Sequence, residues 1–391
     1  MKVLIIPDSF KESLTAAQVA DAIAEGIRKV SNDIECQTLP IGDGGEGTAD
    51  ALTHALNGHS VCATSVDALG REIKAVYGIT DSANDGSETA IIEIASASGL
   101  EQIEIANRNP LIATTRGTGK LISHALDRGV RKFFIGLGGS ATNDGGAGML
   151  QALGAKFYGP QGLIDHIQPR HLSDLVDIDL STLDARYRTA SIQVACDVEN
   201  PLLGVKGATR IFGPQKGVTE DLIERMEAGI ERLADLLELK TGRSSREKRG
   251  AGAAGGAGFA LMQTTDANFH SGVDLILSIT GADKRIEWAD LIITGEGCFD
   301  SQSLEGKVPI GVARRAESLG KPVVILCGVL GHEYIPPNNL PAVCAVFPII
   351  DRLAPLSQTL IDARTNLART ASQVIQTLYL GKKIAADLRD F

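Results

Sequence analysis

The two ends of the chain carry the same local pattern: a short apolar segment, then a loop, then an amphipathic helix. Residues 3–6 form an unbroken aliphatic run, which is typical of a strand buried on both faces of a parallel sheet. Thr15 and Gln18 then form a capping box ahead of apolar residues at helical spacing. Further apolar strand-like runs occur at residues 34–39, 291–294, 323–327 and 342–349. This alternation predicts an α/β protein with a doubly wound sheet.

The middle of the chain is less regular and predicts a second domain. With 391 residues, the chain is long enough to bury two hydrophobic cores. The regular alternation of predicted strands and helices is interrupted there by two glycine-rich stretches, at residues 136–148 and 250–259. We therefore expect a first domain made of residues 1–60 and 284–391, with a second α/β domain, residues 61–283, inserted into it.

The charge balance argues against several classes of partner. The 38 basic and 48 acidic residues leave a net charge of −10, and no basic block interrupts the sequence. We therefore expect no binding to nucleic acid or to anionic membranes. No apolar run approaches the roughly 18 residues of a membrane span. The six cysteines have no paired spacing, which indicates reduced thiols and a cytoplasmic protein.

The segment GLGGSATNDGGAG, at residues 136–148, follows an apolar strand and precedes a predicted helix. Backbone N–H groups and hydroxyls in such a loop can hold a phosphate at a helix N-terminus. The alternative is a tight turn capped by Asp144. The segment also matches the GxGxxA dinucleotide pattern, but no acidic residue follows at the spacing that binds a ribose. We expect the phosphates to be bound by Gly138, Gly139, Ser140, Thr142 and Asn143.

Two further loops combine carboxylates with hydroxyls or glycines after predicted strands. The segment DSFKES, at residues 8–13, places an acid, hydroxyls and Lys11 at the edge of the sheet. The segment PIGDGGEGT, at residues 40–48, places Asp43 and Glu46 on a flexible glycine frame. These carboxylates can bind Mg²⁺ through water or accept a proton. Alternatively, they are acidic residues stabilised by the dipole of the following helix.

Three other segments place charged side chains on turns. ACDVENPLLG and IFGPQKG contain Asp197 and Lys216, and ITGEGCFDSQSLEGK contains Glu296. A lysine on such a turn can neutralise a transferring phosphoryl group, and an aspartate can accept a hydroxyl proton. Solvated surface turns are the alternative. Several acids and lysines at strand ends indicate phosphoryl transfer more than hydride transfer.

These motifs together resemble the type I glycerate kinase family. DSFKESLTA, DGGEGT, GLGGSATNDGGAG, CDVENPLLG, FGPQKG, GAGAAGG and the final GKVP region occur in order over nearly the whole chain. The resemblance implies a flavodoxin-like, doubly wound parallel sheet built from both chain ends, an inserted second α/β domain, and an active site in the cleft. It also implies ATP- and Mg²⁺-dependent phosphorylation of D-glycerate, usually at the 2-hydroxyl, with the 3-hydroxyl as the alternative. We expect the protein to be a monomer or homodimer. The rival functions are a nicotinamide-dependent 2-hydroxyacid dehydrogenase and a non-catalytic organic-acid sensor.

The roles of the residues are inferred from the chemistry that the reaction requires, namely an anion clamp, a base and cations near the phosphates. Asp197 is the expected base, with Asp43 as its rival, and Lys216 is expected to stabilise the phosphoryl group beside Gln215. The residues expected to bind glycerate are Asp8, Ser9 and Lys11, with Arg71 and Arg116 as helpers. The residues expected around Mg²⁺ are Asp43, Glu46, Asp144 and Glu296.

One position departs from the family pattern. Members commonly read GEGR where this chain reads GEGC, so Cys298 replaces an arginine. A cysteine supplies neither the charge nor the bidentate reach of a guanidinium. We expect another cation, such as Arg71 or Arg116, to substitute. The alternatives are that the arginine is only structural or that this site is weakened.

Overall fold

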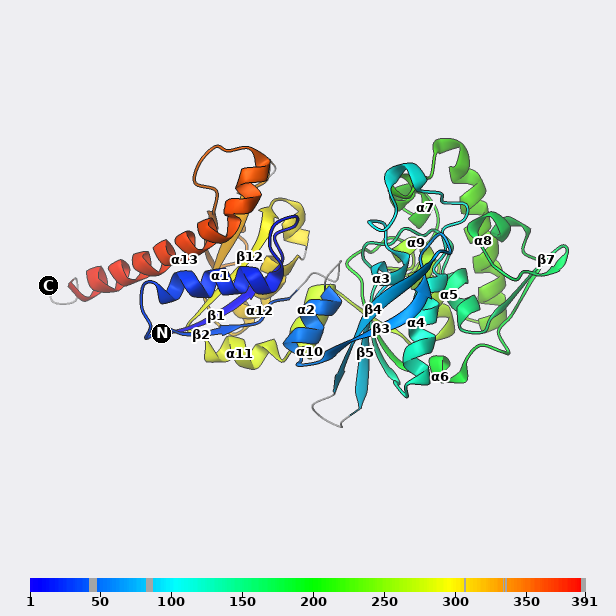
Figure 1. The fold of residues 1–391 in the computed structure, drawn as a ribbon, viewed down its shortest axis with the longest axis horizontal. Helices are drawn as coiled ribbons and strands as arrows, with labels where there is room; N and C mark the ends of the chain where they lie inside the picture. Colours follow the sequence, from blue (N-terminus) through cyan, green and yellow to red (C-terminus); the bar gives the residue numbers. More distant parts are fainter. Residues whose placement is uncertain (42–47, 82–86, 306, 333, 335, 388–391) are drawn as a thin grey trace. The chain divides into compact units, whose positions relative to one another are not determined.

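The computed structural model describes the whole chain except residues 42–47, 82–86, 306, 333, 335 and 388–391. The chain divides into two compact units (Figure 1). The first unit consists of Met1–Asp43 and Val273–Phe391, and the second consists of Gly44–Gly272. Each unit has its own parallel strands and its own helices.

The first unit contains a five-stranded sheet in which every pair of neighbouring strands is parallel. The strands lie in the order β14-β13-β12-β1-β2. When these strands are renumbered 1 to 5 in chain order, the sheet read from the β2 edge has the order 2-1-3-4-5, which is the flavodoxin-like order. Its topological switch point, where the strand order changes direction, lies between β1 and β12. The bounds are β1 (Lys2–Pro7), β2 (Glu35–Thr38), β12 (Leu291–Phe299), β13 (Val323–Leu330) and β14 (Val343–Pro348).

Two long helices, α1 (Ala16–Arg28) and α13 (Leu356–Asp387), pack against each other on this sheet (Figure 1). The predicted capping box is present, since Thr15 Oγ1 accepts from Gln18 N and Gln18 Oε1 accepts from Thr15 N. A Cβ at Gly26 would lie 2.0 Å from the Ala368 carbonyl oxygen, so only glycine allows the two helices to approach this closely. The remaining helices of the unit are α10 (Gly272–Ile279), α11 (Ala282–Trp288), η4 (Gln302–Glu305) and α12 (Val308–Ser318).

The second unit contains a six-stranded sheet in the order β11-β10-β6-β5-β4-β3. Its strands are β3 (His59–Val66), β4 (Glu72–Asp81), β5 (Glu88–Glu93), β6 (Lys132–Gly136), β10 (Ser191–Ala195) and β11 (Asn268–His270). The four strands from β5 to β11 are mutually parallel, so their carboxyl ends share one edge, while β3 and β4 are antiparallel. A separate small sheet consists of β7 (Lys156–Gly159), β8 (Gly162–Leu163) and β9 (Asp177–Asp179).

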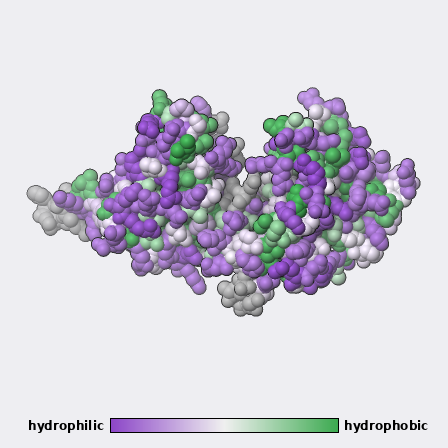
Figure 2. Space-filling view, in the orientation of Figure 1, coloured by the Kyte–Doolittle hydropathy of each residue, from purple (hydrophilic) through white to green (hydrophobic). Residues whose placement is uncertain are grey.

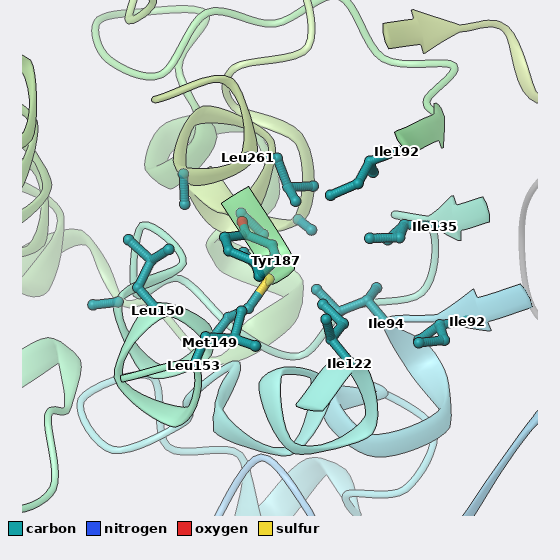
Figure 3. Close-up of a cluster of buried hydrophobic side chains, with 14 of the residues drawn as sticks. Ile92, Ile94, Ile122, Ile135, Met149, Leu150, Leu153, Tyr187, Ile192 and Leu261 are labelled. Atoms are coloured by element: carbon teal, nitrogen blue, oxygen red, sulfur yellow. The ribbon is translucent and has the colours of Figure 1, made fainter. Parts of the chain in front are cut away.

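Tyr187 lies in the core of the second unit, among aliphatic side chains from β6, β10, α4, α5 and α9 (Figure 3). It is fully buried, and its hydroxyl lies 3.0 Å from Thr264 Oγ1, so the polar end of the ring is satisfied inside an apolar core.

The larger helices of the unit are α2 (Thr48–Ala55), α4 (Arg116–Asp127), α5 (Ala147–Ala152), α8 (Glu220–Thr241) and α9 (Ala253–Thr264). The shorter ones are α3 (Ala95–Ser98), η1 (Ile105–Asn107), η2 (Pro169–Asp174), α6 (Ala185–Arg188), α7 (Ala208–Phe212) and η3 (Pro214–Lys216).

Candidate functional site

A cavity of about 330 Å³ lies at the switch point of the first unit, beyond the carboxyl ends of its parallel strands. It is the position at which open α/β sheets bind ligands. Four of the residues predicted for the site line this one cavity: Asp8, Ser9, Lys11 and Glu296. They come from β1 and β12, which are adjacent in the sheet, with Pro7 paired to Gly295.

The loop after β1 is tightly closed and presents Lys11 at its tip. The amides of Phe10 and Leu14 donate to each other's carbonyl oxygens at 2.8 and 2.9 Å. Ser13 Oγ donates to the carbonyl of Leu360 at 2.8 Å, which fastens the loop to α13. Glu12 has a φ of 63°, a left-handed conformation that is costly for a residue with a Cβ. The loop is therefore held in a strained shape that leaves Lys11 exposed at the cavity.

The opposite side of the polar part of the cavity comes from β12 and the start of α12. Glu296 is buried, and Lys307 Nζ lies 3.9 Å from its Oε2 and 3.9 Å from Asp300 Oδ1. Cys298 Sγ lies 3.8 Å from Asp300 Oδ2. Burial, followed by the negative charges of Asp300 and Glu296, raises the pKa of the Cys298 thiol. The cysteine is therefore a neutral thiol near neutral pH, in a cavity that also contains Lys11 and Lys307.

In the second unit, the glycine-rich loop after β6 is bound by a buried ammonium group. Lys216 is 3% exposed, and its Nζ donates to Ser140 Oγ at 2.9 Å and to the Thr142 carbonyl at 2.8 Å. Burial lowers the pKa of Lys216 to about 7, and the charge of Asp144 opposes this shift. Asn143 Nδ2 donates to Thr209 Oγ1 at 2.9 Å. The structure thus brings Ser140, Thr142, Asn143 and Lys216 together.

Asp144 lies inside the same loop and accepts four hydrogen bonds. Its Oδ2 accepts from Thr115 N, Thr115 Oγ1 and Gly148 N at 2.8, 2.9 and 3.1 Å, and its Oδ1 accepts from Gly146 N at 3.0 Å. The carboxyl group is 1% exposed, and burial raises its pKa while the bonds from Thr115 oppose the shift most strongly. This geometry is that of a residue that shapes the loop and ties it to the start of α4.

The second glycine-rich stretch packs against the first. Ala254, Gly255 and Gly256 all have positive φ, and the Gly255 carbonyl accepts from Gly145 N at 2.9 Å. A Cβ on Gly255 would lie 2.0 Å from the Thr142 carbonyl oxygen. These glycines are therefore required for backbone packing behind the loop, a role that the sequence pattern did not reveal.

Asp197 follows β10, whose last residue, Ala195, pairs with Gly136 at the end of β6. It is exposed, and its Oδ1 accepts from Gly272 N at 2.8 Å. Asp197 and the glycine-rich loop therefore lie at the same edge of the sheet. Gln215 is exposed beside Lys216, and its carbonyl accepts from Arg108 Nη1 at 2.8 Å.

The two predicted arginine helpers belong to the second unit, whereas Lys11 and Ser9 belong to the first. Arg71 lies in the turn between β3 and β4, with its Nε 2.5 Å from Asp67 Oδ2. Arg116 begins α4, and its Nη1 lies 3.2 Å from Gln151 Oε1. The predicted carboxylates Asp43 and Glu46 lie outside the described residues. Among those that are described, no cluster of three or more metal-ligating side chains occurs.

Several residues near these loops were not predicted. Glu93 ends β5 at the same edge as the glycine-rich loop, is buried, and accepts from Ala49 N at 2.6 Å. A glutamate that ends the apolar run AII is the signal by which it could have been found. Thr115 and Thr209, which hold Asp144 and Asn143, have no such signal, because threonines are common at helix starts.

Comparisons with known proteins agree with the sequence motifs. A model of the glycerate kinase family matches residues 3–379. A glycerate kinase from Bacillus subtilis (strain 168) is 43% identical over 98% of this chain and 99% of its own length. A glycerate 2-kinase from Escherichia coli (strain K12) is 42% identical over 98% of this chain and 100% of its own length. The crystal structure of a candidate glycerate kinase 2 from Salmonella typhimurium LT2 has a TM-score of 0.88 at 43% identity, covering 98% of this chain and 99% of that one. These matches confirm the family resemblance and the predicted fold class.

Proposed function

The chain belongs to the glycerate kinase family, and from that premise we propose how its residues carry out the reaction. The enzyme phosphorylates glycerate with ATP as the phosphoryl donor. The acceptor is the 2-hydroxyl of D-glycerate, which the name of the Escherichia coli relative supports, so the product is 2-phosphoglycerate. The observation that carries the residue assignment is the buried contact of Lys216 with the glycine-rich loop.

The second unit stabilises the charge that develops during transfer. The 2-hydroxyl oxygen attacks the γ-phosphorus, and the bond from that phosphorus to the bridging oxygen breaks. We assign the stabilisation of the transferring group to Lys216 and to the backbone N–H groups and hydroxyls of residues 138–143. Asp197, exposed at the same edge, is the proposed base for the hydroxyl proton. Gln215 lies next to Lys216 and is proposed to contact the same phosphates.

The cavity of the first unit binds an anionic part of a substrate at its polar end. Lys11 and Ser9 are the proposed donors, with Asp8 orienting the loop through its Oδ1, which accepts from Ser9 N at 2.6 Å. From the sequence, we predict that this anion is the carboxylate of glycerate. Arg71 and Arg116 remain proposed helpers for anions bound to the second unit.

Mg²⁺ is proposed as the metal that accompanies ATP, where it would neutralise phosphate charge. Kinases usually hold Mg²⁺ through one or two carboxylates plus phosphate oxygens, so a preformed cluster of three ligands is not required. Of the described candidates, Glu296 fits best, because it lines the cavity. Asp144 fits poorly, because both of its oxygens already accept hydrogen bonds. We therefore propose that Asp144 shapes the loop.

The test is proton-coupled ³¹P NMR of the product from ATP, Mg²⁺ and D-glycerate. A phosphate ester on the C2 methine gives a doublet, whereas an ester on the C3 methylene gives a triplet. We expect the doublet. A triplet would contradict the regiochemistry, and the absence of any new ester signal would contradict the kinase assignment. Reduction of NAD⁺ by glycerate would instead favour a dehydrogenase, and glycerate binding without ADP release would favour a sensor.

A further inference from the structure

The cavity of the first unit has two chemically different halves. Its polar half holds the charged residues already described, from β1, β12 and the start of α12. Its other half is apolar and comes from the ends of β13 and β14 and from the first turns of α13. The apolar side chains on this wall are Val329, Ile349, Ile350, Leu356, Leu360 and Ala363. Exposed apolar residues also occur on this part of the surface (Figure 2), and Leu353, in the loop before α13, is fully exposed.

Glycerate cannot use this wall. Each of its three carbons carries oxygen, so placing it against aliphatic side chains would remove water from polar groups without replacing their hydrogen bonds. The volume of about 330 Å³ is also within the range of pockets that hold ligands much larger than a three-carbon acid. Among the reactants of the proposed function, only the adenine ring of ATP offers a flat apolar surface of matching character.

We propose that the apolar wall between β14 and α13 binds the adenine base of the nucleotide, with the phosphates directed toward Lys11 and Lys307. This inference rests on the proposed function and changes one assignment within it. The anion beside Lys11 and Ser9 is then a nucleotide phosphate rather than the carboxylate of glycerate. The position agrees with the general rule that nucleotides bind at the switch point of a doubly wound sheet.

Polar groups on the wall suit the edge of the base. Asn366 is buried and lines the cavity, and its Oδ1 accepts from Arg369 Nη1 at 3.2 Å. A side-chain amide can pair with the donor and acceptor that adenine presents side by side. Thr359 lines the same wall one turn before Ala363, and its hydroxyl donates to the Pro355 carbonyl at 3.2 Å. A larger side chain at position 359 would therefore occupy the space assigned to the base.

The experiment measures binding of adenosine and of ADP to the full chain by isothermal titration calorimetry. In Thr359→Trp, we expect both ligands to bind at least tenfold more weakly than in the wild type. Ile361→Trp is the matched control, since Ile361 lies on the same helix, is exposed and does not line the cavity. It should leave both affinities unchanged. Circular dichroism and thermal unfolding establish that both variants fold.

A second variant separates the base from the phosphates. Lys11→Ala should weaken ADP at least tenfold and leave adenosine unaffected. The inference would be overturned if Thr359→Trp bound adenosine and ADP as tightly as the wild type does. It would also be overturned if the wild type bound adenosine and no substitution in the cavity changed that affinity. Because binding is measured without turnover, this outcome is separate from the kinase assignment. If Thr359→Trp raises the KM for ATP but not for glycerate, the inference is supported; an unchanged KM for ATP would leave the kinase intact and reject the adenine site.

Discussion

Lys216 Nζ lies 2.9 Å from Ser140 Oγ, across a separation of 76 residues in sequence. The ammonium also binds the Thr142 carbonyl, so one buried lysine fixes two points of the glycine-rich loop. Pro214 begins the short helix that carries Lys216, and Gly217 ends it with a φ of 93°. The side chain of Lys216 is 3% exposed, so its charge is little screened by water.

Replacing Lys216 should therefore impair catalysis more than folding. Lys216→Met keeps the length and apolar stem of the side chain but removes its charge. We expect turnover to fall about a hundredfold or more, the usual cost of losing one group that stabilises transition-state charge. Steady-state assays with saturating ATP and glycerate measure this. Lys206→Met is the control, since Lys206 is exposed, and it should retain normal turnover. Near-normal turnover in a folded Lys216→Met protein would reject the role.

The low pKa of Lys216 predicts a pH dependence of activity. Burial lowers this pKa from its ordinary value of 10.5 to about 7, so the charged form is depleted as pH rises through neutrality. If the ammonium is the active form, kcat/KM should decline as pH rises above about 7. The residual activity of Lys216→Met should lack this decline. A flat wild-type profile between about pH 7.5 and 9, where both substrates are fully ionised, would contradict the assignment.

The same shift predicts how stability changes with pH. Because the folded-state pKa lies below that of the unfolded chain, the unfolded chain binds more protons between about pH 7 and 10.5. The destabilising contribution of Lys216 is therefore complete below pH 7 and disappears toward pH 10.5. Urea unfolding at pH 7 and pH 9 should show that the free energy of unfolding of the wild type, minus that of Lys216→Met, increases at the higher pH. A difference that stays constant or decreases would contradict this expectation.

The sequence pattern places Asp8 and Glu296 after predicted strands, and the rule that brings them to one cavity is topological. Carboxyl ends of neighbouring parallel strands meet at one edge, so Asp8 and Glu296 are brought together although 288 positions separate the strands that carry them. The apolar wall could not be predicted in this way. Ile349 and Leu360 have the appearance of ordinary core residues, and only the packing of α13 shows that they border a cavity.

The burial of the Lys216 side chain also could not be predicted from the sequence. A lysine in a polar turn with Pro and Gly is usually solvated, and no local pattern distinguishes an inward ammonium from an outward one. Asp144 shows the opposite case. Its capping alternative was visible in the sequence, and the structure gives it four hydrogen-bond donors from the loop, α4 and α5.

Asp144→Asn tests whether this carboxylate shapes the loop or binds the metal. An amide nitrogen cannot accept hydrogen bonds, so at least one buried donor would lose its partner. We expect the free energy of unfolding to fall by about 2 to 4 kcal/mol in urea titrations. Asp177→Asn is the control, because its ion pair with Lys240 is exposed to solvent and should contribute little to stability. Unchanged stability together with a raised requirement for Mg²⁺ would instead assign Asp144 to the metal.

The packing of the two glycine-rich stretches predicts that alanine lowers the free energy of unfolding by different amounts at two glycines. Both glycines have a left-handed backbone conformation. Gly255 has a φ of 64° and no room for a Cβ, whereas Gly242 has a φ of 69° and nothing within 4 Å of an added Cβ. Gly242→Ala should cost only backbone strain, about 1 kcal/mol. Gly255→Ala should cost at least about 2 kcal/mol more, because it also displaces the Thr142 carbonyl. Equal losses in urea unfolding would show that the close approach is relieved at little cost.

The substitution Cys298→Arg introduces the arginine that family members commonly carry at this position. It tests whether the absence of that arginine weakens the wild-type site. Losing a charge-assisted pair outright costs about 2 to 4 kcal/mol, or roughly 30- to 1000-fold in catalytic efficiency, if nothing replaces it. The structure places Lys11 and Lys307 on the same cavity, and Lys307 Nζ is already 3.9 Å from Asp300, the acid nearest to Cys298. An arginine introduced at position 298 would compete with Lys307 for Asp300 and add a third positive charge to a cavity that already has two. We therefore expect kcat/KM for either substrate to change by less than tenfold. A larger gain would mean that these lysines do not replace the guanidinium, because only an unfilled anion contact can recover that much free energy.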